Sequence, residues 1–207
     1  HGEGLWMTQP GVTESELFQQ AVREAGEHLH ALQSAWLNHE CAAKVFAGYC
    51  YGTYLPPLYT RGSAEVVAEN ATAVQYQLDQ QGCLLNGSRP LVLLEMPPLT
   101  YFVAGTLPIP TFFQVICDQS PCGLVLDVGH LWTVYRYTGA YRTISLPRFV
   151  ETFLDAFPLN RVVARREDSA PDCQRFPQPL FPVQADEFHQ ADDGVPRDPD
   201  ARGVVLP

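Results

Sequence analysis

Two short apolar runs, each ended by a carboxylate, constrain the fold of this chain more than any other feature. The runs are Leu91-Val-Leu-Leu-Glu95 and Leu124-Val-Leu-Asp127, and neither alternates apolar with polar residues. A strand without alternation is buried on both faces, as in a parallel sheet covered by helices. We therefore expect an α/β fold, in which side chains at the carboxyl ends of the strands line the functional site.

Helical periodicity surrounds these two runs. Apolar residues recur every three or four positions in several segments of the chain. The expected helices span about 14–34, 62–80, 109–118 and 145–156. Further strands are expected around 36–39 and from 160 onward. Strands separated by helices in this way favour a parallel sheet over an antiparallel meander.

Charge and composition exclude some classes of partner. The formal net charge of −10 leaves no basic face for phosphates, so nucleic acid and anionic membranes are not expected as partners. No apolar run reaches the roughly 18 to 20 residues of a spanning helix. The six cysteines include no Cys-x-x-Cys pair, and we expect them to be reduced thiols. We expect a soluble, cytoplasmic protein.

The carboxylates that end the two runs predict a metal site. A carboxylate buried without a partner costs several kcal/mol, and two of them close together repel one another. A cation bound by Glu95 and Asp127 would satisfy both. His130 follows Asp127 by three residues, across Gly129, so its imidazole can join the same site. Such mixed ligands suit Fe, Mn or Zn in an open site.

Each candidate also has a purely structural interpretation. Asp127 could cap the next helix beside a hydrogen-bonded His130, and Glu95 could pair with an Arg or Lys. His39, in an apolar segment, could be either a ligand or a hydrogen-bonded core residue. The other histidines are expected to be solvated, on a helix or in an acidic run: His28, His30 and His189.

The segments around these residues resemble the multinuclear non-heme iron-dependent oxidative enzymes, the family that includes the methanobactin biosynthesis oxygenase. The order and spacing of five motifs carry the resemblance: His1-Gly-Glu-Gly-Leu5, Leu37-Asn-His39, Leu93-Leu-Glu95-Met-Pro-Pro98, Gly123-Leu-Val-Leu-Asp127-Val-Gly-His130 and Phe153-Leu-Asp-Ala-Phe-Pro-Leu-Asn-Arg-Val-Val163. His130 stands where many members carry Asn.

The resemblance implies a fold, a metal and a substrate class. It implies a TIM barrel, here partial, with residues 1–163 forming about strands 2 to 6 as the metal-binding domain. The implied iron ligands are His1, His39, Glu95, Asp127 and His130. They would hold two or three iron ions that use dioxygen to oxidise a cysteine-containing peptide, in some family members presented by a small partner protein.

The chain departs from the family at both ends. By the resemblance, the first strand and its helix are expected to be missing, and the family continues Glu-Ile-His where this chain reads Ala164-Arg-Arg166. Residues 164–207, rich in Pro, Asp and Arg, are expected to form a divergent, weakly ordered tail. Two alternatives therefore stand beside the iron enzyme: a sugar-isomerase-like TIM barrel using Mn or Zn, and an inactive remnant or interaction protein.

Overall fold

Three parallel strands form the central sheet of the computed structural model, which describes residues 4–82, 88–99 and 103–163. The strands are β1 (Trp36–Glu40), β4 (Leu91–Glu95) and β5 (Gly123–Val125), hydrogen-bonded in the order β1-β4-β5. The parallel sheet predicted from the two apolar runs is confirmed, although β5 ends two residues before Asp127. His1 and residues 164–207 lie outside the described residues.

The register of β1 against β4 determines which side chains share a face. Glu40 is the partner of Glu95, and His39 is the partner of Leu94. Because side chains alternate along a strand, Glu40 and Glu95 lie on one face and His39 lies on the other. Leu94 belongs to the buried core, so the face that carries His39 is the one covered by helices.

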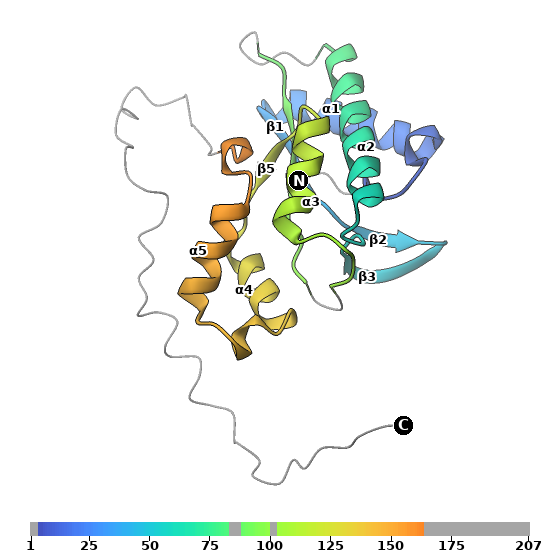
Figure 1. The fold of residues 1–207 in the computed structure, drawn as a ribbon. Helices are drawn as coiled ribbons and strands as arrows, with labels where there is room; N and C mark the ends of the chain where they lie inside the picture. The colour runs from blue at the N-terminus through green and yellow to red at the C-terminus, as the bar shows by residue number, and fades with distance from the viewer. Residues whose placement is uncertain (1–3, 83–87, 100–102, 164–207) are drawn as a thin grey trace, which may run out of the picture. The chain divides into compact units, whose positions relative to one another are not determined.

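Along the chain, one helix precedes the first strand of the central sheet, one lies between each two successive strands of that sheet, and two follow the last strand (Figure 1). Their bounds are α1 (Glu16–Leu32), α2 (Arg61–Gln80), α3 (Ile109–Gln119), α4 (Val128–Tyr137) and α5 (Leu146–Ala156). α2 packs on α3 and on α1, and α3 packs on α5. The described residues thus form a mixed α/β unit with sequential parallel strands, in which the closed barrel implied by the family resemblance is not seen.

The four predicted helices are confirmed, with ends set by local chemistry. α1 begins at Glu16 because the short 3-10 helix η1 (Val12–Glu14) precedes it. The Thr60 side chain accepts a hydrogen bond from the Ser63 amide at the start of α2. α3 and α5 each carry a proline in the first turn, where its missing N–H costs no helical hydrogen bond.

One structural element was not predicted, one was predicted only as an alternative, and one expected strand lies only in part within the described residues. A hairpin of β2 (Ala43–Phe46) and β3 (Tyr49–Leu55) turns through Ala47 and Gly48, both at positive φ. α4 was anticipated only by the alternative in which Asp127 caps the next helix, and its bounds were not predicted. Of the strand expected from residue 160 onward, the described residues reach only Val163; they form the 3-10 helix η3 (Leu159–Arg161) and a parallel bridge between Leu124 and Val162.

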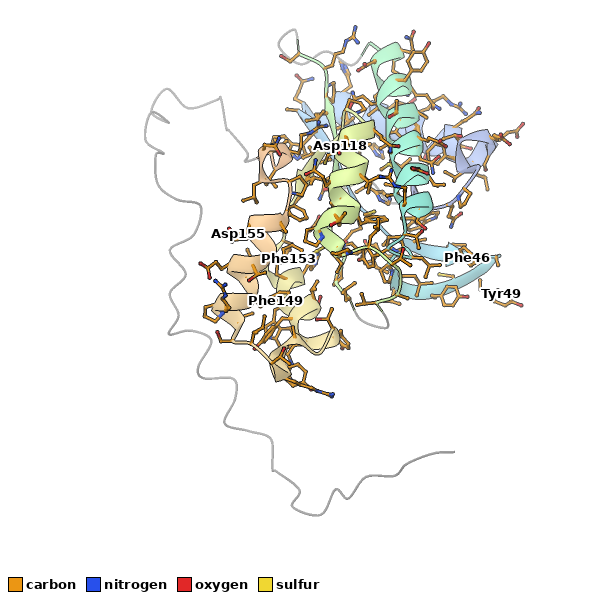
Figure 2. The ribbon with its side chains drawn as sticks, viewed as in Figure 1. Phe46, Tyr49, Asp118, Phe149, Phe153 and Asp155 are labelled. Atoms are coloured by element: carbon orange, nitrogen blue, oxygen red, sulfur yellow. The ribbon has the colours of Figure 1, made fainter. Side chains whose placement is uncertain are left out.

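Aromatic packing holds α4 against α5. The Tyr135 ring on α4 lies 5.3 Å from that of Phe149, and Phe149 and Phe153 lie 5.9 Å apart along α5 (Figure 2). Phe153 continues the contact to Phe157 at 5.5 Å. Such ring pairs add about 0.5–1.5 kcal/mol each beyond their buried area. This packing fixes the helix whose first turn carries His130.

The helices and the cysteines of the described part of the chain bear on membrane crossing and on disulfide bonding. None of its helices combines the length and the apolarity that crossing a membrane requires. Four cysteines of this part, Cys41, Cys50, Cys117 and Cys122, are free thiols.

Gly105 provides a test of the packing that follows β4. A Cβ on Gly105 would lie 2.2 Å from the Tyr59 carbonyl oxygen, and the φ angle of Gly105 is +142°. The Tyr59 oxygen also accepts the amides of Thr106 and Leu107 at 2.9 Å, so this backbone cannot move aside without losing both bonds. We expect Gly105→Ala to lower the free energy of unfolding by more than about 2 kcal/mol, measured in urea.

Gly62, on α2, is the matched control. A Cβ there meets no atom within 4 Å. We expect Gly62→Ala to be neutral or to stabilise by up to about 1 kcal/mol, since alanine favours the helix. Equal effects of the two substitutions would contradict the close approach at Gly105.

Candidate metal centre

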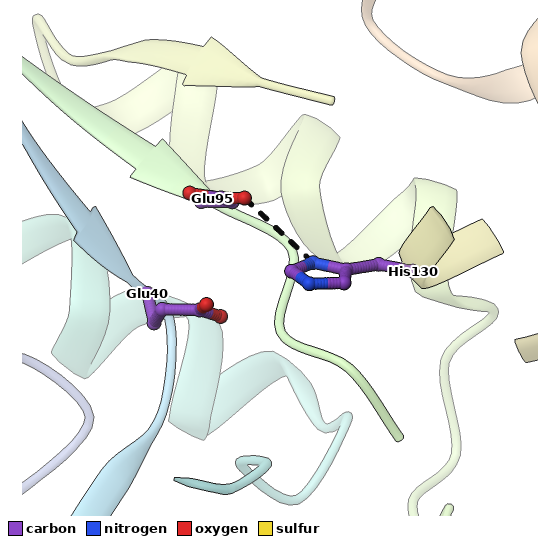
Figure 3. Close-up of side chains that lie close together, drawn as sticks. All are labelled: Glu40, Glu95 and His130. Carbon is purple, nitrogen blue, oxygen red and sulfur yellow. Dashed lines mark ion pairs between the residues drawn. The ribbon is translucent and has the colours of Figure 1, made fainter. Parts of the chain in front are cut away.

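Three side chains converge at the carboxyl ends of β1 and β4. Glu40 ends β1, Glu95 ends β4, and His130 lies in the first turn of α4. One potential ligand atom from each lies within 4.8 Å of the other two (Figure 3). Segments that are far apart in the sequence therefore supply one compact group of two carboxylates and one imidazole.

The sheet register places the two carboxylates side by side. Glu40 and Glu95 are direct neighbours across the β1–β4 ladder and are only 6% and 8% exposed. The Cys41 amide extends this ladder by one bond, to the Glu95 carbonyl at 2.8 Å. Neighbouring buried carboxylates repel each other in a medium that screens charge poorly, so this arrangement favours a cation between them.

Asn38 orients one of the carboxylates. It lies two residues before Glu40, on the same face, and its Nδ2 donates to Glu95 Oε2 at 2.6 Å. The Asn38 Oδ1 atom is buried and accepts no hydrogen bond from the described part of the chain. An acceptor of this kind next to two carboxylates suits a water molecule held by a bound ion.

His130 has its ring orientation fixed by the backbone. Its Nδ1 lies 2.6 Å from the carbonyl oxygen of Met96, the residue after Glu95. A carbonyl oxygen only accepts, so Nδ1 donates and the neutral ring carries its lone pair on Nε2. The same Nδ1 lies 3.7 Å from Glu95 Oε1. A hydrogen bond from one ring nitrogen to a carbonyl is the usual support for a histidine that binds metal through the other.

Asp127 is the N-cap of α4. Its Oδ1 accepts hydrogen bonds from the amides of Gly129 at 2.6 Å and His130 at 3.3 Å. Its other oxygen, Oδ2, lies 3.9 Å from His130 Nε2, and the side chain is 45% exposed. The capping interpretation is therefore present in the structure, while Oδ2 remains near the imidazole. Asp127 is not part of the three-residue group.

The structure places the remaining predicted ligands differently. His39 is 1% exposed, with its Nδ1 2.6 Å from the Glu40 carbonyl oxygen and its ring 5.8 Å from that of Trp6. It lies outside the three-residue group, on the opposite face of β1. His28 and His30 are exposed on α1, as predicted, whereas His1 and His189 lie outside the described residues.

Glu40 is the site residue that the sequence did not reveal. The motif Leu37-Asn-His39 directed attention to the histidine one position earlier. Strand alternation alone could not identify Glu40, because only the observed register shows that Glu40, and not His39, shares a face with Glu95. The register itself is not readable from the sequence.

Cys41, next to Glu40, is not suited to act as a further ligand. Burial raises the pKa of its thiol far above the usual range, and the charges of Cys122 and Glu40 act in the same direction. Metal ions bind the thiolate and not the thiol. The donor set at this end of the sheet is therefore oxygen and nitrogen.

The geometry fits a divalent transition-metal ion. With bonds of about 2.1 Å, ligand atoms on opposite sides of one ion lie roughly 4.2 Å apart. One ligand atom from each of the three residues lies within 4.8 Å of the other two, which is close to that spacing. Two carboxylates balance the charge of such an ion, and the set suits Fe, Mn or Zn better than Cu(I).

Comparison with known proteins gives one distant similarity. The chain is 24% identical over 165 residues to a UPF0276 protein of Paraburkholderia phytofirmans. The aligned region covers 78% of this chain and 46% of that protein, so the chain spans less than half the length of its relative. No family model matches the chain. Fold and site together describe an α/β protein with a candidate carboxylate–histidine metal centre.

Replacing Asp127 separates its two possible roles. Without metal, Asp127→Ala removes the cap of α4 and is expected to lower the free energy of unfolding by about 1 kcal/mol, whereas Asp127→Asn keeps an accepting oxygen and loses less. Chemical denaturation in the presence of a chelator measures both. If the two variants are equally stable, capping does not explain the residue; if only metal affinity falls in Asp127→Asn, the carboxylate serves the ion.

Proposed function

We propose that this chain is a metal-dependent protein that binds a divalent transition-metal ion through Glu40, Glu95 and His130. The single observation that carries this proposal is the convergence of their ligand atoms at the carboxyl ends of two parallel strands. In α/β folds this edge of the sheet is the usual place for ligand sites. Glu40 and Glu95 are buried at paired positions of the ladder, and a bound cation would offset the repulsion between their carboxylates.

The function we propose in more detail is that of an iron-dependent, dioxygen-using oxidative enzyme acting on a cysteine-containing peptide. Its support is the resemblance of the motifs around Glu95, Asp127 and His130 to the multinuclear iron family. Glu95 and His130 belong to the three-residue group, and Asp127 Oδ2 lies 3.9 Å from His130 Nε2. Iron would supply the activation of dioxygen. Asp127 and, by the resemblance, His1 would bind further ions, whereas His39 lies on the other face of β1.

The residues of the chain would have distinct tasks. Glu40 and Glu95 would supply negative charge and oxygen ligands, and His130 would supply Nε2. The Met96 carbonyl would hold the imidazole in the binding tautomer, and Asn38 would orient Glu95 through its 2.6 Å hydrogen bond. Small changes in these supporting contacts are expected to alter metal affinity more than stability.

Direct metal analysis tests the proposal. After anaerobic incubation with Fe²⁺ and removal of excess metal, the purified protein is expected to retain at least one ion per chain by inductively coupled plasma mass spectrometry. We expect Glu40→Gln, Glu95→Gln and His130→Ala each to weaken binding at least tenfold, because each removes a ligand. Bound metal should also raise the melting temperature of the wild-type protein.

Glu65→Gln is the matched control, since Glu65 is half-exposed on α2 and paired with Arg61. It is expected to bind metal like the wild type. Retention of metal by the Glu40, Glu95 and His130 variants would refute the site. Stoichiometric Zn with no Fe after iron loading would reject the iron enzyme and favour the sugar-isomerase-like Mn/Zn alternative, and the absence of any bound metal would favour the inactive remnant.

A further inference from the structure

We propose that α4 and the turn after it bind an acidic segment of a peptide. The surface consists of Trp132, Arg136, Tyr141 and Arg142, and we call it the arginine–aromatic surface. That the bound peptide is the substrate rests on the function proposed above. The binding itself does not depend on metal and can be tested separately.

The charge pattern of this segment differs from that of the rest of the chain. Residues 128–150 contain three arginines and no Asp, Glu or Lys, whereas the whole chain has 23 acidic and 13 basic residues. A local excess of positive charge on an acidic protein attracts short acidic ligands and repels large polyanions. The segment therefore favours a peptide with a few carboxylates over a nucleic acid.

The arginines are arranged on aromatic rings. The Arg136 guanidinium carbon lies 4.4 Å from the centroid of the Tyr141 ring and 5.7 Å from that of Trp132. Arg142 lies 5.5 Å from the Tyr141 centroid and donates from Nε to the Tyr141 hydroxyl at 3.2 Å. Stacking uses the flat face of a guanidinium and leaves N–H groups on its edge for a carboxylate.

The two arginines have no acidic partner within the part of the chain that the structure describes. Three other arginines of that part are paired, in Arg61–Glu65, Arg89–Asp79 and Arg148–Glu151. Arg136 and Arg142 instead share one tyrosine ring, which places their charges within about one Debye length of each other. An acidic ligand would relieve this repulsion.

The exposed aromatic side chains complete the surface. Trp132 is 46% and Tyr141 38% exposed, so both offer apolar area beside the guanidinium groups. Arginine and aromatic residues are the types most enriched where proteins bind peptides tightly. His130 lies in the first turn of the same helix, so a peptide bound here would be held on the helix that supplies a proposed ligand.

Fluorescence anisotropy with a defined probe tests this surface in the metal-free protein of 207 residues. The probe is a fluorescein-labelled decapeptide of alternating Glu and Gly, and its comparison peptide has Gln in place of Glu. We expect the Glu peptide to bind more tightly than the Gln peptide, with affinity falling as salt rises. The double variant Arg136→Gln/Arg142→Gln is expected to bind it about threefold to tenfold more weakly.

The control variant is Arg61→Gln/Arg89→Gln, which removes the same charge from paired positions and is expected to bind like the wild type. Equal binding of both peptides, or equal loss in both double variants, overturns the proposal. So does stronger binding of a ten-nucleotide oligothymidylate or of phosphatidylserine vesicles. The peptide assay uses the metal-free protein and the metal assay measures bound Fe²⁺, so a failed metal site and a failed peptide surface give different results.

Discussion

The in-register pairing of β1 with β4 is the constraint on which the rest of the site depends. It sets Glu40 beside Glu95 on one face of the sheet while Leu94 enters the core on the other. A shift of one residue would exchange the two faces and place Glu95 on the helix-covered face that now holds Val92 and Leu94. The apolar side of β4 therefore enforces the register, and the register in turn brings the two carboxylates together.

Much of the framework could be predicted because it follows from local patterns. The uninterrupted apolar run before Glu95 predicted a buried parallel strand, and periodic apolar residues predicted four helices within a few positions. Glu95 was recognised as a candidate ligand because it ends such a run. His130 was recognised because it follows Asp127, the carboxylate that ends the other apolar run. These inferences need only the nearest neighbours in the sequence.

The remainder depended on contacts between distant segments. α4 has a strand-like composition with Val128, Trp132 and Tyr135, and it becomes helical because Asp127 caps it and Leu131 and Val134 are buried. The β2–β3 hairpin turns through Ala47 at φ 50°, a conformation that alanine seldom adopts and that no sequence pattern announces. Glu40 could not be recognised as a candidate ligand because its position beside Glu95 depends on the register of β1 against β4.

The Met96 carbonyl has a consequence for how sites of this kind diverge. The residue is followed by Pro97 and Pro98, which have no amide hydrogen to continue the ladder, so the chain leaves the sheet here and its oxygen reaches His130. Any amino acid at position 96 supplies the same oxygen. Selection for the tautomer of His130 that is protonated on Nδ1 would then act on Pro97 and Pro98 and on the path of the backbone. Because the Met96 carbonyl belongs to the backbone, position 96 itself would not be conserved in an alignment.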